Sequence, residues 1–150
     1  MQMQLAFRHD TGWIGRYLIA RVTGSPVHVA LCFGEDVVIE ADGGRVREIT
    51  RLERLANGQW TLVTCNLTAQ QAWWALQFAR GQVGKQYDWL GVLWAWWWGK
   101  PAGNAARDKW FCSELAAAAL MAAGQQMGKN RAAYFTPRRL WEWCAVWRRV

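Results

Sequence analysis

Apolar and polar residues between positions 27 and 41 follow the pattern of a β-hairpin. Residues 27–33 (VHVALCF) and 37–41 (VVIEA) are two apolar runs rich in β-branched side chains, and the turn sequence Gly-Glu-Asp separates them at 34–36. Two short apolar runs joined by such a turn are typical of two antiparallel strands. The pattern therefore predicts a hairpin over residues 27–41.

Two further strands are predicted after this hairpin. Gly43 and Gly44 form a second turn sequence, and polar and apolar residues then alternate over residues 45–49, as in a strand with one buried face. Residues 60–65 (WTLVTC) are again rich in β-branched side chains. We therefore expect a central antiparallel sheet or barrel.

Helix signals surround these strands. The second helix opens with a capping box of Thr68 and Gln71, and the last opens with the N-cap and N1 residues of Thr136-Pro137. An α+β architecture in one domain, residues 1–150, is expected for a chain of this length and pattern. Four helices are predicted, at about residues 11–22 (after Asp10 or Thr11 and before Gly24), 68–81, 111–123 and 136–147.

The composition is that of a folded protein with an unusual aromatic content. The 150 residues are 53% hydrophobic and 19% charged, which excludes a disordered chain, and 13 of them are tryptophan. The net charge of +7 favours an anionic partner such as a cell-wall polymer or a lipid surface. Because the arginines are scattered and no zinc-finger or RNP-type motif is present, we expect no specific binding of nucleic acid.

The N-terminal sequence MQMQLAFRHD lacks a basic region followed by a long apolar stretch and therefore predicts no secretory signal. The most apolar run, residues 90–98 (LGVLWAWWW), is nine residues long, against roughly 20 in a membrane-spanning helix. We expect a protein that is cytoplasmic or leaves the cell by a non-classical route, such as phage lysis or a dedicated secretion system.

The four cysteines and two histidines offer few metal ligands. Cys32, Cys65, Cys112 and Cys144 are far apart, and the chain has no CxxC or HxxxH pair. We therefore expect reduced thiols, no metal and no other cofactor.

Cys112 is the candidate nucleophile. It stands at the start of the alanine-rich helix predicted over residues 111–123, where the positive end of the helix favours a thiolate and unpaired backbone N–H groups can stabilise an oxyanion. A small core residue is the alternative, because free cysteines are among the most buried residue types. A base close to the thiol would decide between the two.

His28 is the better candidate for that base. It opens an apolar strand at the rim of the sheet, whereas His9 lies in the polar sequence RHDTG, where a capping or exposed role is expected. The predicted hairpin brings Glu40 beside His28, so that its carboxylate can orient the imidazole. Asp42 lies on the same face of the strand and is the alternative orienting residue.

The sequence resembles the papain-like NlpC superfamily in its circularly permuted branch, which includes YiiX-type enzymes and relatives of lecithin:retinol acyltransferase. The resemblance rests on the segments TGSPVHVALCFG, VVIEADGGRV, GKQYDW, WFCSEL and TPRRLW, which occur in the family's order, with the histidine strand before the cysteine helix. It implies a papain-like α+β fold with the catalytic cysteine at the N-terminus of a helix. The family commonly has a serine directly before the histidine, where this chain has Val27, with Ser25 two residues earlier.

The resemblance implies a cysteine peptidase or amidase with Cys112 as nucleophile, His28 as base and Glu40 as the third polar residue. The implied reaction forms an acyl-thioester, with an amide of a cell-wall (peptidoglycan) peptide as the expected substrate. A thiol-dependent lipid acyl hydrolase or acyltransferase and a noncatalytic binding protein on the same fold are the alternatives. Three more residues are expected to contact the substrate, with a core position as the alternative for the first: Tyr87, Trp110 and Ser113.

Four tryptophans precede the candidate nucleophile. Trp94, Trp96, Trp97 and Trp98 cannot all lie on one side of a regular helix or strand. Exposed tryptophans would suit a membrane interface or stacking on sugars, and a core or oligomer contact is the alternative. Residues 99–108 predict a flexible loop that could act as a lid.

Overall fold

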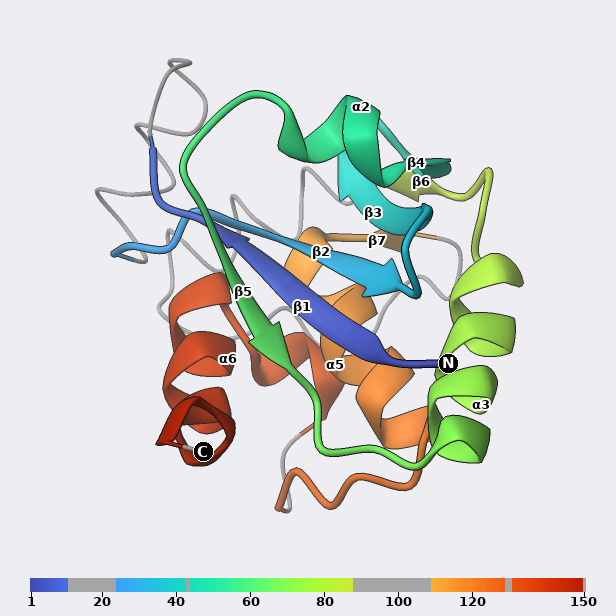
Figure 1. Cartoon of the computed structure of the whole chain (residues 1–150), viewed down its shortest axis with the longest axis vertical. Coiled ribbons are helices and arrows are strands. Elements are labelled where there is room, and N and C mark those ends of the chain that lie inside the picture. Colours follow the sequence, from blue (N-terminus) through green and yellow to red (C-terminus); the bar gives the residue numbers. More distant parts are fainter. Residues whose placement is uncertain (11–23, 43, 88–108, 129–130, 150) are drawn as a thin grey trace.

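Seven strands form one open sheet in the computed structural model, which describes residues 1–10, 24–42, 44–87, 109–128 and 131–149 (Figure 1). The order across the sheet is β5-β1-β2-β3-β4-β6-β7, and all neighbouring strands are antiparallel except β6 and β7. The predicted α+β class is confirmed. The strands form an open sheet and not a closed barrel. The strands are β1 (Met3–Arg8), β2 (His28–Phe33), β3 (Val37–Asp42), β4 (Arg45–Thr50), β5 (Trp60–Thr64), β6 (Gln86–Tyr87) and β7 (Lys109–Trp110).

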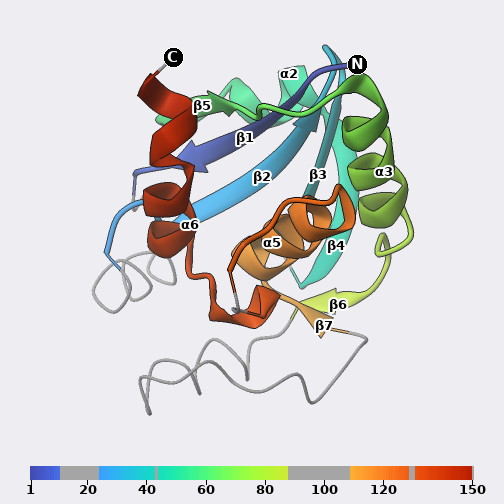
Figure 2. The same ribbon diagram turned by 90° about the horizontal axis from the view of Figure 1, so that it is seen from below.

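Helices cover both faces of the sheet unequally. The helices α3 (Ala69–Arg80), α5 (Cys112–Ala122) and α6 (Pro137–Trp143) lie against one face, with α5 between the other two (Figure 2). The short helix α2 (Arg51–Leu55) lies on the opposite side of the sheet. The 3-10 helices η1 (Ala132–Tyr134) and η2 (Cys144–Arg149) complete the described chain.

The central strands are buried on both sides because both layers contact them. Every residue of β2 is buried. Leu31 belongs to the large apolar cluster under α3, α5 and α6, whereas its neighbour Cys32 belongs to a small cluster that includes Leu55 of α2 and Trp60 of β5. Side chains of a strand alternate between faces, so β2 contributes to both cores.

The alanines of α5 allow this helix to pack closely on the sheet. Ala116, Ala117 and Ala119 are fully buried, and α5 contacts both β2 and β3. Small side chains reduce the distance at which a helix can lie against strands, and alanine also has the highest helix propensity. The described helices include none long and apolar enough to cross a membrane.

Most of the predicted strands and helices are present in the described chain. The hairpin at 27–41, the strands at 45–49 and 60–65, and the helices near 68–81 and 111–123 are confirmed, whereas α6 gives way to the 3-10 helix η2 at Cys144. Strand β1, which occupies the interior of the sheet, and helix α2 were not predicted. The helix expected at 11–22, the four tryptophans and the loop at 99–108 lie outside the described residues.

Candidate functional site

Cys112 is the first residue of α5. The preceding N-cap residue, Phe111, has an extended backbone (φ −102°, ψ 161°), and its side chain caps none of the N–H groups of the first turn. These groups are the usual orphan donors of a helix start. Cys112 is 5% exposed and belongs to the large core cluster. The candidate nucleophile therefore lies at a helix N-terminus, as predicted.

His28 lies where β2 begins, with its backbone paired to Arg8 of β1. The residue is buried, and its ring meets the ring of Trp60 edge to face at a centroid distance of 6.1 Å. The ladder between β2 and β3 joins residues 31–33 to residues 37–39 only. Beyond this ladder the side chains of His28 and Glu40 meet across the two strands.

Glu40 is the carboxylate that orients His28. The two side chains are joined by a hydrogen bond of 2.8 Å between Nε2 of His28 and Oε2 of Glu40. The Glu40 side chain has no exposed surface. Arg47 donates two hydrogen bonds to Oε1, at 2.9 and 3.2 Å, and Nε of Arg54 forms an ion pair with Oε2 at 2.7 Å.

The charges around Glu40 keep it ionised despite its burial. Burial alone would raise the pKa of the carboxyl group, but the hydrogen bond and charge of His28, together with Arg54 and Arg47, outweigh burial and lower the pKa of Glu40 to about 2. Glu40 is therefore a fixed negative charge at every pH at which the protein is expected to work.

The imidazole of His28 is held protonated between Cys112 and Glu40. Burial disfavours the charged ring, but the coulombic attraction of Cys112, side-chain hydrogen bonding with Cys112 and the hydrogen bond to Glu40 outweigh burial and raise the pKa of His28 to about 9. Because Nε2 faces Glu40, Nδ1 is the nitrogen left for the sulfur of Cys112. Cys112, His28 and Glu40 therefore form a series of cysteine, imidazolium and carboxylate, the arrangement that thiol-dependent acyl transfer uses.

Asp42, the alternative orienting residue, is paired with the same two arginines as Glu40. Its carboxylate accepts a hydrogen bond of 2.9 Å from Nη2 of Arg54 and lies 3.6 Å from Nη2 of Arg47. Ligand atoms of His28, Glu40 and Asp42 lie within 4.8 Å of one another, a group that could hold a metal ion. A cation would have to displace both arginines from these carboxylates, so the donor set does not fit a metal.

The three predicted substrate contacts lie close to Cys112. Trp110 and Ser113 are near it in the sequence, and Tyr87 is paired with Trp110 across β6 and β7. Tyr87 and Trp110 are paired on β6 and β7, and Trp110 packs edge to face on Phe78 of α3 at 5.9 Å. Tyr87 is a buried core residue, Trp110 is half-buried, and Ser113 is fully buried in the first turn of α5. The ring N–H of Trp110 and the hydroxyl of Ser113 are buried without a hydrogen-bond partner among the described residues.

His9 takes no part in this site. Its Nδ1 lies 3.0 Å from Oγ of Ser25, and its ring packs edge to face on Trp141 of α6 at 5.2 Å. Ser25, the serine nearest to His28 in sequence, therefore contacts the other histidine.

The remaining cysteines are buried thiols away from His28. All four cysteines are free, as expected. Burial raises the pKa of Cys32 to about 11 and raises the pKa of Cys65 further still. Cys32 and Cys65 therefore stay protonated at neutral pH, which makes them internal controls for Cys112.

Three residues of the site were not found from the sequence: Arg47, Arg54 and Trp60. A signal for Arg47 was present in the Gly-Gly sequence after Asp42, because a short connection pairs Asp42 with Arg45 and thereby places Arg47 opposite Glu40. The sequence of α2 has no hydrophobic periodicity that would predict its packing on the sheet. The contact of Arg54 with Glu40 could therefore not be inferred from the sequence.

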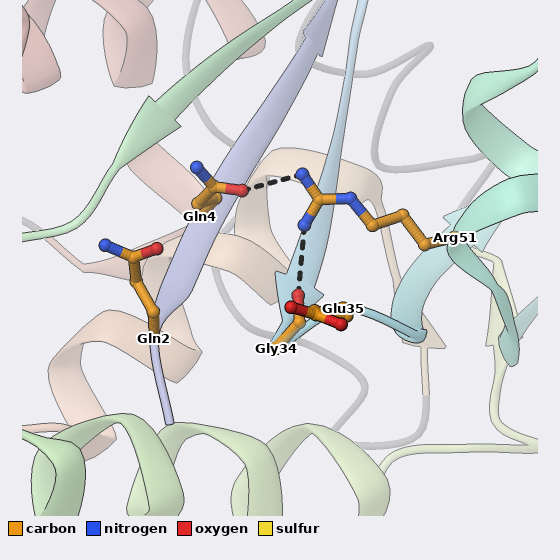
Figure 3. Close-up of a pocket in the computed structure, with 5 residues that line it drawn as sticks. All are labelled: Gln2, Gln4, Gly34, Glu35 and Arg51. Carbon is orange, nitrogen blue, oxygen red and sulfur yellow. Dashed lines mark hydrogen bonds between the residues drawn. The ribbon is translucent and has the colours of Figure 1, made fainter.

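A polar pocket of about 520 Å³ lies at the opposite end of β1 and β2 from His28. Arg51 of α2 bridges its wall, donating hydrogen bonds to the carbonyl of Gly34 at 3.0 Å and to Oε1 of Gln4 at 2.8 Å (Figure 3). Six residues of extended strand, roughly 20 Å, separate Gly34 from His28. This pocket is therefore a separate feature from the Cys112 site.

Comparison of the chain with family models, with curated proteins and with solved structures gives no significant match.

Proposed function

We propose that the chain is a cysteine hydrolase of the permuted NlpC type, with a papain-like fold, that cleaves an amide of a cell-wall (peptidoglycan) peptide. The observation that carries the proposal is the buried series of contacts from Cys112 through His28 to the ionised Glu40. A helix N-terminus bearing the thiol and an imidazole held protonated beside it are the parts that thiol-dependent acyl transfer requires. The net charge of +7 suits the anionic polymers of a cell wall.

In the first half-reaction the sulfur of Cys112 attacks the carbonyl carbon of the substrate, and the carbonyl oxygen takes up the negative charge. The backbone N–H of Cys112, at the N-terminus of α5, is the expected donor for this oxyanion. One donor of this kind typically contributes about 3 kcal/mol in the transition state. His28 gives its proton to the amide nitrogen, the C–N bond breaks, and the amine leaves while the acyl group stays on sulfur.

In the second half-reaction the neutral His28 removes a proton from water, and the resulting hydroxide attacks the thioester carbonyl. The C–S bond breaks, the carboxylic acid leaves, and the thiolate of Cys112 faces a protonated His28 again. Glu40 holds the ring through Nε2 in both steps and, because its pKa is about 2, does not exchange a proton. Trp110, half-buried beside β6, is the side chain we expect to contact the substrate first.

The second candidate function is that of a lipid acyl hydrolase or acyltransferase with the same chemistry. The observation in its favour lies on α3, where Trp73 is 52% and Trp74 is 43% exposed. Phe78, one turn after Trp74, packs on Trp110 two residues before Cys112. Exposed tryptophans suit a membrane interface, so this helix face would bring the thiol close to a lipid surface.

Substrate trials with two variants test the proposal. Purified wall fragments are incubated with the protein, and release of amino groups is measured; vesicles of anionic lipid are assayed in parallel for release of fatty acid. We expect amino-group release that is lost in Cys112→Ala and kept in Cys32→Ala, which removes a buried thiol outside the site. Fatty-acid release with the same dependence would favour the lipid enzyme instead, and absence of both would favour a noncatalytic binding protein.

A further inference from the structure

The carboxylate of Glu40 contacts two arginines in addition to His28. The orientation of His28 would require only the hydrogen bond to its ring. Oε1 accepts two hydrogen bonds from Arg47, and Oε2 is shared between Nε2 of His28 at 2.8 Å and Nε of Arg54 at 2.7 Å. Two positive groups therefore compete for the same oxygen atom in a buried site. The attraction that Glu40 exerts on a protonated His28 is reduced by each of them.

Arg54 is the more tightly held of the two arginines. Its side chain is 11% exposed, against 41% for Arg47. It also donates a hydrogen bond to Asp42 at 2.9 Å, and its guanidinium lies over the ring of Trp60 at 5.0 Å from the centroid. Trp60 also contacts the ring of His28. Arg54 and His28, which share Oε2 of Glu40, therefore pack against the same tryptophan.

The charged groups around His28 come from every element packed against it. Arg8 of β1 also lies over Trp60, at 5.5 Å, but it is paired with Asp10 at 2.7 Å, which offsets its charge. Arg47 and Arg54 share the carboxylate of Asp42, at 3.6 and 2.9 Å, in addition to that of Glu40. Within the part of the chain that the structure describes, the charged and titratable groups around the imidazole are Arg8 with Asp10, Glu40 and Asp42 of β3, Arg47 of β4, Arg54 of α2 and Cys112 of α5.

We propose that Arg54 is a positioning residue that, through the shared oxygen of Glu40, sets how firmly His28 holds its proton. The catalytic meaning of this inference rests on the proposed function, because a general acid must both hold and release a proton. Glu40 alone would bind the imidazolium so strongly that proton transfer to the leaving group would be disfavoured. Arg54 weakens that hold while keeping the carboxylate ionised and in place.

The expected size of the effect follows from the geometry. Since the two nitrogens lie 2.8 Å and 2.7 Å from one oxygen, they are within about 5.5 Å of each other, the sum of the two distances. Two like charges at that separation in a partly screened site change a pKa by roughly one unit. Removing Arg54 removes a positive charge, so the protonated form of His28 is favoured and its pKa rises.

A purely structural role makes a different prediction. If Arg54 only anchors α2 to the sheet, its replacement lowers the stability of the protein and leaves the pKa of His28 unchanged. The two roles are therefore separated by a titration of His28 in the folded protein.

The test is an NMR titration of the imidazole C–H resonance. The chain has two histidines, so a His9→Gln background leaves His28 as the single signal. We expect Arg54→Met to raise the pKa of His28 by roughly one unit and Arg54→Lys, which keeps the charge, to leave it close to its starting value. Arg51→Met is the matched control, because it removes a charge from the same helix at the far end of β2.

The inference is overturned if folded Arg54→Met leaves the pKa of His28 unchanged or lowers it, or if Arg51→Met shifts it equally. Should Arg54→Met fail to fold, Arg47→Met takes its place, with a smaller rise expected because that side chain is more exposed. The proposed function can fail independently. If wall fragments are not cleaved while Arg54→Met still shifts the titration, the hydrolase proposal falls and the control of His28 by Arg54 stands.

Discussion

Replacing Glu40 by glutamine should destabilise the protein strongly and in a pH-dependent way. Glutamine has nearly the same shape, so the substitution removes the charge without leaving a cavity. Arg54 and His28 then face a neutral amide at a position with no exposed surface. A buried cation that loses its counter-ion is costly because neither water nor another carboxylate can replace it.

The magnitude follows from the ionisation of Glu40. Its pKa falls from 4.5 to about 2 on folding. That shift is 2.5 units, and at about 1.36 kcal/mol per unit it corresponds to roughly 3 kcal/mol of stability. The figure agrees with the range of about 3–5 kcal/mol typical of a broken buried ion pair.

The sign of the pH dependence follows from the direction of the same shift. Because the pKa of Glu40 is lower in the folded state, its contribution is fully present above pH 4.5 and is lost as the pH falls towards 2. The free energy of unfolding of the wild type should therefore fall steeply in this window. Glu40→Gln should lack that part of the slope, so the two proteins converge in acid.

Urea denaturation followed by circular dichroism at pH 7 and pH 3 provides the measurement. The matched control is Glu48→Gln, which removes a carboxylate from the neighbouring strand β4 that is paired with Arg80 on the surface. We expect a loss of roughly 3 kcal/mol for Glu40→Gln at pH 7 and less than about 1 kcal/mol for the control. A loss below about 1 kcal/mol for Glu40→Gln, or a loss of the same size at pH 3, would show that the charge of Glu40 does not stabilise the fold in this way.

Three further outcomes are expected. The rate of amide cleavage should fall as the pH rises through about 9, because His28 must be protonated to donate a proton to the leaving amine. A kcat/KM that still rises at pH 10 would contradict this role. Thr68→Ala, which removes the hydrogen bond from the backbone N–H of Gln71 to the Thr68 hydroxyl in the capping box of α3, should lower the free energy of unfolding by about 1 kcal/mol, as measured in urea. Ala116→Leu should cost about 1–3 kcal/mol by crowding α5 against the sheet, whereas Ala118→Leu, at a partly exposed position of the same helix, should cost less in the same assay.

Much of the sheet could be predicted because its register is local. The turn sequence at 34–36 and the Gly43-Gly44 sequence predict two hairpins, and the first places His28 and Glu40 on strands that meet. The position of Cys112 could be predicted for the same reason, since the start of an alanine-rich helix is a local signal. The contact between Cys112 and His28 joins parts of the chain 84 residues apart and was reached through the family resemblance, not through spacing.

The features that were missed depend on tertiary packing. Strand β1 is short and its apolar positions only partly alternate, and its place beside β2 and β5 is fixed by pairings that no nearby turn sets. Helix α2 has five residues and none of them is buried, so it leaves no amphipathic pattern to recognise. Its importance lies in Arg54, whose partners Glu40, Asp42 and Trp60 come from two different strands.

The proposed mechanism requires His28 to activate the thiol of Cys112. The most direct measurement is the rate at which chloroacetamide labels each cysteine at pH 7, followed by peptide mass spectrometry, in the wild type and in His28→Ala. We predict that Cys112 is labelled far faster than Cys32, Cys65 and Cys144, and that its rate falls roughly 100-fold in the variant. Equal labelling of all four cysteines, or a Cys112 rate that does not change in His28→Ala, would contradict the account.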